Sequence, residues 1–409
     1  MPHRYQHIIS PLPLGRYILK NRIINSKSMP EVGDPADYPN EHQIEFAARY
    51  ARNGASIVTC QPGEFKEMKG RTFFTSNYDM ESRTCQGMFT KMIERIHAYG
   101  SLASAATMIY LPVDVSISDI HDWSQIPDEF PPGPEGIYAM PGMGQSREKI
   151  VPPEITTEQI RQFIDLFAEY CYKLKCVGFD MVNIYASYNA SILAKSLSPI
   201  LNQRTDEYGG SLQNRARLLR ELLAKIKEVC GEDYPIELQI SGEETLPGGY
   251  STEDFVAYCK IFEPYVDIFQ IRAKSGDLTH VNAYFFEKEY PPNLRYCKLL
   301  KDAGIRSYVA PVGGFQDPAV MERVLEEGLC DLIAQARALI CEENYWEKIL
   351  EDRADEITSC LGCDKCHQGV CAINPRIGNP GWKDMIVPPV RKKKIAVIGG
   401  GPAGLRAAW

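Results

Sequence analysis

Eight short runs rich in β-branched and apolar residues, each followed by an amphipathic helical segment, limit the fold of this chain more than any other feature. The runs lie at 22–29, 55–60, 102–109, 180–185, 235–241, 266–272, 307–313 and 330–335, and the helical segments at 41–53, 83–98, 157–177, 211–230, 252–264, 293–303, 317–328 and 343–350. Alternating strands and helices are typical of a parallel sheet covered by helices. Eight units in about 350 residues predict an α/β fold of the (β/α)8, or TIM, barrel type. The alternative, a doubly wound open sheet, would normally be shorter and have fewer strands.

The composition narrows the class of protein further. The net charge of −8 argues against a nucleic-acid partner, which would require a basic surface. No apolar run approaches the roughly 20 residues that cross a bilayer, and the first 20 residues lack the apolar core of a signal peptide. Thirteen cysteines without a secretion signal indicate reduced thiols rather than a disulfide framework. We therefore expect a cytoplasmic protein with no nucleic-acid or membrane partner, and we leave homo-oligomer formation open.

Four of the cysteines form a compact cluster near the end of the chain. Cys360, Cys363, Cys366 and Cys371 have the spacing C-x2-C-x2-C-x4-C. Structural zinc sites usually separate two C-x2-C pairs by a dozen or more residues. The compact run instead resembles the thiolate ligation of a [4Fe–4S] cluster. We predict an iron–sulfur site, with zinc as the alternative and Cys371 as the least regular ligand.

The last residues have the pattern of a dinucleotide-binding segment. Gly399, Gly401 and Gly404 form a G-x-G-x-x-G motif between a strand-like run, "KIAVIG", and a helix-like run, "GLRAAW". The sequence given stops before the acidic residue expected about 20 positions later. We expect a barrel at 1–350, an iron–sulfur segment and linker at 351–390, and the start of a truncated FAD- or NAD(P)-binding domain at 391–409.

Several motifs in this order resemble the old yellow enzyme family of NADH:flavin oxidoreductases. They are "LGRYILKNRIINSKSMP", "GFDMVNIY", "LSPILNQRTDEYGGSLQNR", "APVGGF", "DLIAQARALI", the cysteine run and "KKIAVIGGGPAG". The match is to the large iron–sulfur branch, which includes 2,4-dienoyl-CoA reductases, 2-enoate reductases and trimethylamine dehydrogenase. The resemblance implies FMN in the barrel and a [4Fe–4S] cluster, with FAD and NAD(P)H in the full-length enzyme. In that branch the last two cysteines are usually further apart than here.

The barrel pattern and the resemblance together predict an FMN site. Barrels hold phosphate with the loops after strands seven and eight, which here contain Gly313 and Gly314, and Ala336 and Arg337. The alternative for the two glycines is an ordinary turn.

Other positions match those that line the flavin in the family. They are Ser26, Lys27 and Ser28 at the end of the first strand and Cys60 at the end of the second. For Cys60 the alternative is a buried core cysteine.

Two positions depart from the family pattern around the flavin. Ala106 replaces a glutamine that contacts the flavin pyrimidine, and Gln239 replaces an arginine that faces flavin N1 and O2. A glutamine can donate a hydrogen bond but supplies no charge. We hypothesise that Lys27 or Arg272, each near the end of a strand, provides the missing charge.

Two tyrosines occupy positions where many relatives carry a His–His or His–Asn pair. Tyr185 and Tyr188 follow the fourth strand. A phenol is neutral near pH 7 and can donate a proton or a hydrogen bond, so both are candidate catalytic residues. The alternative is a pair of aromatic residues that cap the barrel core.

The resemblance predicts an ene-reductase that transfers hydride from FMN to an activated C=C bond of a small enoate, enoyl-CoA or enone. Electrons would come from NAD(P)H through FAD and the cluster. One alternative is an amine dehydrogenase of the trimethylamine dehydrogenase type. Another is a catalytically decayed electron-transfer homologue, consistent with Ala106, Gln239 and Tyr188. The proline- and glycine-rich loop at 110–153 is a candidate substrate lid.

Overall fold

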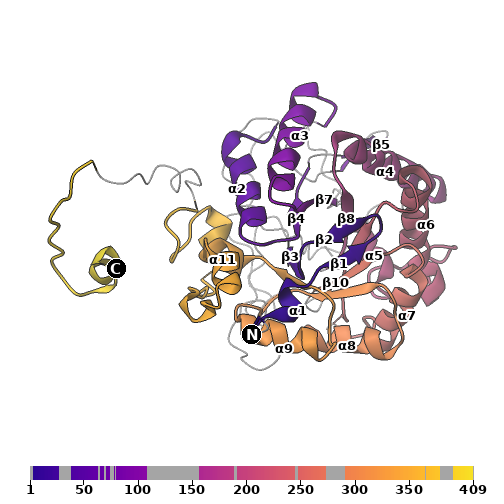
Figure 1. The fold of residues 1–409 in the computed structure, drawn as a ribbon. Coiled ribbons are helices and arrows are strands. Elements are labelled where there is room, and N and C mark those ends of the chain that lie inside the picture. The colour runs from indigo at the N-terminus through magenta and orange to yellow at the C-terminus, as the bar shows by residue number, and fades with distance from the viewer. Residues whose placement is uncertain are drawn as a thin grey trace, which may run out of the picture.

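We describe a computed structural model of the chain (Figure 1). The described residues are 3–26, 38–62, 65–68, 71–73, 78, 80–107, 156–187, 191–244, 247–272, 291–363, 365–377 and 390–408. The candidate lid at 110–153 and the predicted site residues Lys27, Ser28 and Tyr188 lie outside them.

Eight strands form one parallel sheet that closes on itself. They are β3 (Ile23–Asn25), β4 (Ile57–Cys60), β7 (Leu102–Thr107), β8 (Met181–Ala186), β9 (Ile236–Ser241), β10 (Ile268–Arg272), β11 (Tyr308–Pro311) and β12 (Ile333–Gln335). The order in the sheet is β11-β10-β9-β8-β7-β4-β3-β12, and every neighbouring pair is parallel. A parallel bridge between Val312 and Ala334 joins the two ends of this order. The predicted (β/α)8 barrel is therefore confirmed.

Helices surround the barrel, as Figure 1 shows. They are α2 (Glu41–Arg52), α3 (Arg83–His97), α4 (Thr157–Val177), α6 (Leu212–Cys230), α7 (Thr252–Phe262), α8 (Leu294–Asp302), α9 (Pro318–Glu326) and α11 (Tyr345–Leu350). Six of them begin after a side chain that accepts a hydrogen bond from the first turn: Asn40, Ser82, Thr156, Ser211, Ser251 and Asp317. Such caps satisfy backbone N–H groups that have no partner inside the helix, which explains where these helices start.

Several short elements have no counterpart in the predicted pattern. They are α1 (Gln6–Ile9), β1 (Leu12–Leu14), β2 (Tyr17–Leu19), β5 (Phe65–Met68), β6 (Arg71–Phe73), α5 (Ile192–Leu197), α10 (Arg337–Cys341) and the 3-10 turns Ala354–Glu356 and Lys365–Gln368. β1 and β2 form an antiparallel hairpin. Its residues Leu12, Leu14 and Leu19 pack with inward-facing residues of the barrel strands, so the hairpin closes the N-terminal end of the barrel.

The barrel interior changes from apolar to polar along the strands. An inner cluster at the N-terminal end contains Ile24, Ile57, Met181 and Ile268. Successive inward positions on a strand are two residues apart, because side chains alternate between the two faces. The next inward positions are therefore Ser26, Thr59, Asn183 and Gln270, all of them fully buried. The polar layer lies toward the C-terminal end, where barrel enzymes place their active sites.

The residues after the barrel are less regular. Among residues 390–408 there is one helix, α13 (Pro402–Ala408), and no strand. The predicted strand "KIAVIG" is thus not formed. A single strand without a partner leaves its backbone groups unpaired, which is a physical reason for this difference. Within the described part of the chain, no helix has the length and apolar character needed to cross a membrane.

Candidate active site at the C-terminal end of the barrel

Five predicted site residues occupy inward-facing positions at the C-terminal end of the barrel. They are Ser26, Ala106, Tyr185, Gln239 and Arg272, on or next to β3, β7, β8, β9 and β10. Tyr185 and Gln239 are register partners on neighbouring parallel strands. Their side chains therefore leave the sheet on the same face. The structure brings this group together as the sequence predicted, although it does not test the role of any member.

Tyr185 has a supported backbone and a buried side chain. The Ser191 hydroxyl donates to the Tyr185 carbonyl oxygen at 2.8 Å, and the same hydroxyl oxygen caps α5 by accepting from the Ala194 N–H. The Tyr185 side chain lies almost entirely inside the protein, at 7% exposure. A phenol held at this place can meet a substrate that enters the end of the barrel.

Beneath these residues lies a buried carboxyl group that the sequence analysis did not single out. Glu237 accepts a hydrogen bond from Asn183 Nδ2 and another from Gln270 Nε2, each at 2.5 Å. Ser26 Oγ in turn donates to Gln270 Oε1 at 3.4 Å. Burial raises the pKa of Glu237 to about 7, against a smaller lowering by the two amide donors and Arg272. Polar residues at every second position of the run "IELQIS" were the available signal.

Gln239 and Arg272 form a direct contact. Arg272 Nε donates to Gln239 Oε1 at 3.0 Å. The Gln239 side chain is fully buried, and its Nε2 has no hydrogen-bond partner among the described residues. A buried donor without a partner is costly, by about 1–3 kcal/mol, so a ligand acceptor at this position would relieve that cost.

The two predicted phosphate-binding segments are adjacent. The bridge between Val312 and Ala334 places the loop with Gly313 and Gly314 next to the start of α10 at Arg337. Both glycines have positive φ, +96° and +83°. A Cβ built on Gly313 would meet no atom within 4 Å, so open space lies in front of this backbone. This backbone fits the phosphate end of FMN, whereas the Gln239 donor without a partner among the described residues fits a ring acceptor of the flavin.

Cys60 differs from the other predicted flavin contacts. Its side chain packs in the large outer core cluster between strands and helices, with 0% exposure. Burial raises the pKa of the Cys60 thiol to about 12. These observations favour the alternative of a core cysteine, with only the backbone available to a flavin.

The four clustered cysteines lie beside the glycine loop, after the barrel. The backbone N–H of Cys360 donates to Gln316 Oε1 at 2.6 Å. Gln316 lies three residues after Gly313 in the chain. Cys371 forms a thiol hydrogen bond with Cys341, which contributes most to lowering the Cys371 pKa to about 5. Cys366 and Cys371 pack against the outer core cluster, and Cys363 is exposed.

The donor set fits an iron–sulfur cluster by its chemistry, because it supplies four thiols within a short segment. Within the described ranges, however, no three metal-binding side chains converge on a common point. The cluster therefore stays a prediction. Gln316 and Cys341, both close to these cysteines, were not found from the sequence because neither belongs to a motif.

The Gly-x-Gly-x-x-Gly segment keeps one feature of a dinucleotide-binding loop. Gly399 has a positive φ of +104°. A Cβ on Gly404 would meet the Gly399 carbonyl oxygen at 1.9 Å, so this position of α13 excludes any side chain. Gly401 lies just before α13.

Comparisons with known proteins decide the family. A profile of the NADH:flavin oxidoreductase / NADH oxidase family matches residues 7–356. The chain belongs to this family. FMN is therefore the cofactor that the barrel is expected to hold, and the predicted resemblance to the old yellow enzyme type is confirmed.

Individual relatives of this chain carry names of different activities. A cinnamate reductase from Clostridium sporogenes is 27% identical over 451 residues, covering 100% of this chain and 63% of the relative. A dimethylamine dehydrogenase from Hyphomicrobium is 27% identical over 338 residues, covering 78% and 44%. A structure of 2-naphthoyl-CoA reductase has a TM-score of 0.81 at 25% identity, covering 99% of this chain and 62% of that one. The chain spans about three fifths of the length of the first of these relatives.

Proposed function

We propose that the chain is the flavin-binding barrel of an oxidoreductase that reduces an activated C=C bond of an enoate, enoyl-CoA or enone. The observation that carries this proposal is the position of Tyr185. Its buried phenol faces the barrel interior near the C-terminal end of β8, in register with Gln239. The named activities of the cinnamate reductase and the 2-naphthoyl-CoA reductase support it. When FMN is bound, it supplies the hydride.

The protein side chains would orient and protonate the substrate. Tyr185 would donate a hydrogen bond to the activating carbonyl or a proton to the α-carbon. Gly313, Gly314 and Arg337 would hold the flavin phosphate through backbone N–H groups and a guanidinium. Gln239 would donate its Nε2–H, which has no partner among the described residues, to the flavin pyrimidine edge. Tyr188 and the residues at 110–153 stay candidates for the substrate-facing side.

Electrons would reach the barrel through the cysteine segment. The hydrogen bond from Cys360 to Gln316 connects this segment to the glycine loop that would hold FMN. A [4Fe–4S] cluster at Cys360, Cys363, Cys366 and Cys371 would then lie near one end of the flavin site. FAD and NAD(P)H would belong to the part of the enzyme that follows Gly399, Gly401 and Gly404.

A second function, oxidation of a small amine, is favoured by one specific observation. Relatives that cover most of this chain include the dimethylamine dehydrogenase and an N,N-dimethylglycine/sarcosine dehydrogenase from Chromohalobacter salexigens, 24% identical over 419 residues. A tyrosine at position 185 is compatible with this direction of hydride transfer as well.

The experiment that tests the proposal replaces Tyr185 by phenylalanine. In Tyr185→Phe, reoxidation of the reduced flavin by an enone should slow by about 100-fold, the lower end of what a general acid contributes. FMN content should not change, because the ring remains in place. Tyr172→Phe is the matched control, since Tyr172 is an exposed tyrosine on α4. Wild-type reoxidation rates in Tyr185→Phe would remove Tyr185 from the mechanism.

A further inference from the structure

The buried amide of Gln239 is in contact with a charged side chain, that of Arg272, on the neighbouring strand. Gln239 is fully buried in β9, at the position where the resemblance places a charged arginine. Its two amide atoms are used unequally. Oε1 accepts from Arg272, whereas Nε2 has no partner among the residues that the structure describes.

Arg272 fixes which way this amide points. A guanidinium has only donors, so the amide oxygen must face Arg272 and the amide nitrogen must face away from it. The contact of 3.0 Å runs from the last residue of β10 to the neighbouring strand. The Nε2 donor is thereby held in a single orientation, buried and without a hydrogen-bond partner among the described residues.

The positive charge of Arg272 also reaches the buried polar layer. Arg272 is one of the groups that lower the pKa of Glu237, against the larger effect of burial. The Glu237 carboxyl group accepts hydrogen bonds from Asn183 and Gln270. The cation is therefore shared between a glutamine that faces the site and a carboxyl group one layer below.

We propose that Arg272 is a positioning residue that acts through Gln239 and replaces, from the neighbouring strand, the arginine that this family places at position 239. The Gln239 Nε2–H group donates to the pyrimidine edge of FMN. Arg272 polarises that amide by donating to its oxygen, and it places a positive charge on the side of the amide opposite Nε2. The inference rests on FMN binding in the barrel and is independent of which substrate the enzyme uses.

The physical consequence concerns the charge that the flavin gains on reduction or on adduct formation. A donor and a cation near the N1–O2 edge stabilise negative charge there more than they stabilise the neutral oxidised ring. Loss of the Arg272 charge should therefore lower the flavin midpoint potential. It should also weaken the adduct of sulfite with the flavin, which places negative charge on the same edge.

The experiment measures sulfite affinity and midpoint potential in FMN-loaded variants of the full chain. Arg272→Met keeps the length of the side chain and removes its charge, and its sulfite dissociation constant should rise by about tenfold or more. Arg272→Lys should show a smaller rise. The double variant Gln239→Arg with Arg272→Met, which moves the cation to position 239, should recover most of the loss. Arg161→Met, at an exposed residue of α4 paired with Glu207, is the matched control and should equal the wild type.

Two results would overturn the inference. One is wild-type sulfite affinity and midpoint potential in Arg272→Met with normal FMN content. If Arg272→Met does not retain FMN, Gln239→Leu decides, because it removes the amide and keeps the cation: unchanged sulfite affinity in that variant also overturns the inference. Sulfite binding involves no substrate, so neither result depends on whether alkenes or amines are the substrates.

Discussion

At the scale of single residues, the barrel interior is an apolar base below a buried polar layer. Met181 and Ile268 belong to the base, and Asn183, Glu237 and Gln270 belong to the layer above it. Inward positions on the same strands are two residues apart, so this order was present in the sequence. The resemblance to the family pointed to Gln239 and Tyr185, and Arg272 was considered because it lies near the end of its strand. Glu237 was missed because it belongs to none of the motifs that carry the resemblance, although it lies two residues before Gln239 on the same strand.

The buried Glu237 predicts a measurable dependence of stability on pH. Its pKa is raised from the usual 4.5 to about 7 in the folded protein. A carboxyl group whose pKa is raised in the folded state makes its full contribution to the free energy of unfolding below about pH 4.5. It loses this contribution as the pH rises through about 7. The free energy of unfolding should fall by about 3 kcal/mol over this range from Glu237 alone.

The variant Glu237→Gln isolates this contribution. We expect the difference in unfolding free energy between the wild type and Glu237→Gln to change between pH 4.5 and pH 7.5, in favour of the variant at the higher pH. Urea unfolding at several pH values, with the same excess of FMN, measures it. Two curves that stay parallel across this range would show that Glu237 titrates in the folded protein as it does in the unfolded one.

At the scale of elements, the sequence predicted those strands and helices that are long enough to show a regular hydrophobic periodicity. All eight strands and the eight helices that follow them lie within a few residues of their predicted ranges. The β1–β2 hairpin, α5 and α10 were not predicted, because three to six residues are too few to show a period. The strand expected before Gly399 has no partner strand, which the local pattern "KIAVIG" could not indicate. Cys60 was predicted to contact the flavin, whereas its side chain lies on the outer face of β4, which packs against the helices.

The glycine loop after β11 allows a prediction with a close control. Gly313 and Gly328 both have positive φ, and a Cβ on either would meet no atom within 4 Å. Alanine at either position should destabilise the fold by about 1–2 kcal/mol through backbone strain. Gly313→Ala should in addition weaken FMN binding by about tenfold, equivalent to about 1.4 kcal/mol, because its Cβ faces the space assigned to phosphate.

Fluorescence titration of apoprotein with FMN distinguishes the two effects of these substitutions. Gly328 follows α9 and lies away from the loop with Gly313, so Gly328→Ala should keep wild-type FMN affinity. Equal FMN dissociation constants for Gly313→Ala and wild type would place the phosphate elsewhere.

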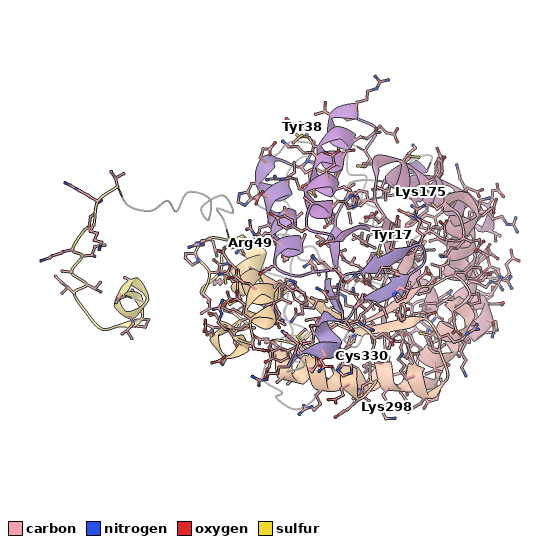
Figure 2. All side chains as sticks on the ribbon, viewed as in Figure 1. Tyr17, Tyr38, Arg49, Lys175, Lys298 and Cys330 are labelled. Carbon is pink, nitrogen blue, oxygen red and sulfur yellow. The ribbon has the colours of Figure 1, made fainter. Side chains whose placement is uncertain are left out.

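At the scale of the whole molecule, ionic and polar contacts fasten the cysteine segment to the barrel. Glu343 accepts from Arg49 of α2 at 2.6 Å and from Arg376 at 2.9 Å. Asn374 Nδ2 donates to the Ile340 carbonyl oxygen at 2.8 Å. Figure 2 shows Arg49 where α2 faces this segment. Sequence spacing could predict the cysteine set but not these contacts, because neither Arg49 nor Glu343 belongs to a motif and the two lie 294 positions apart.

The proposed cluster predicts a specific loss of iron. Cys363→Ser should reduce the iron content well below the about four atoms per chain expected of a [4Fe–4S] cluster, measured on anaerobically purified protein. Cys176→Ser is the matched control, because Cys176 is also exposed but lies on α4. Equal iron in both variants would exclude Cys363 as a ligand, and zinc in place of iron would support the alternative metal.

The central claim is that this barrel holds FMN and passes hydride to an activated alkene. It is tested most directly by the visible absorption spectrum of the FMN-loaded protein, reduced anaerobically and then titrated with cinnamate, an enoyl-CoA and a simple enone. We expect that at least one of these restores the oxidised flavin spectrum within the time of the experiment, whereas dimethylamine leaves oxidised flavin unchanged. Failure of all three alkenes, together with bleaching of the oxidised flavin by dimethylamine, would contradict it.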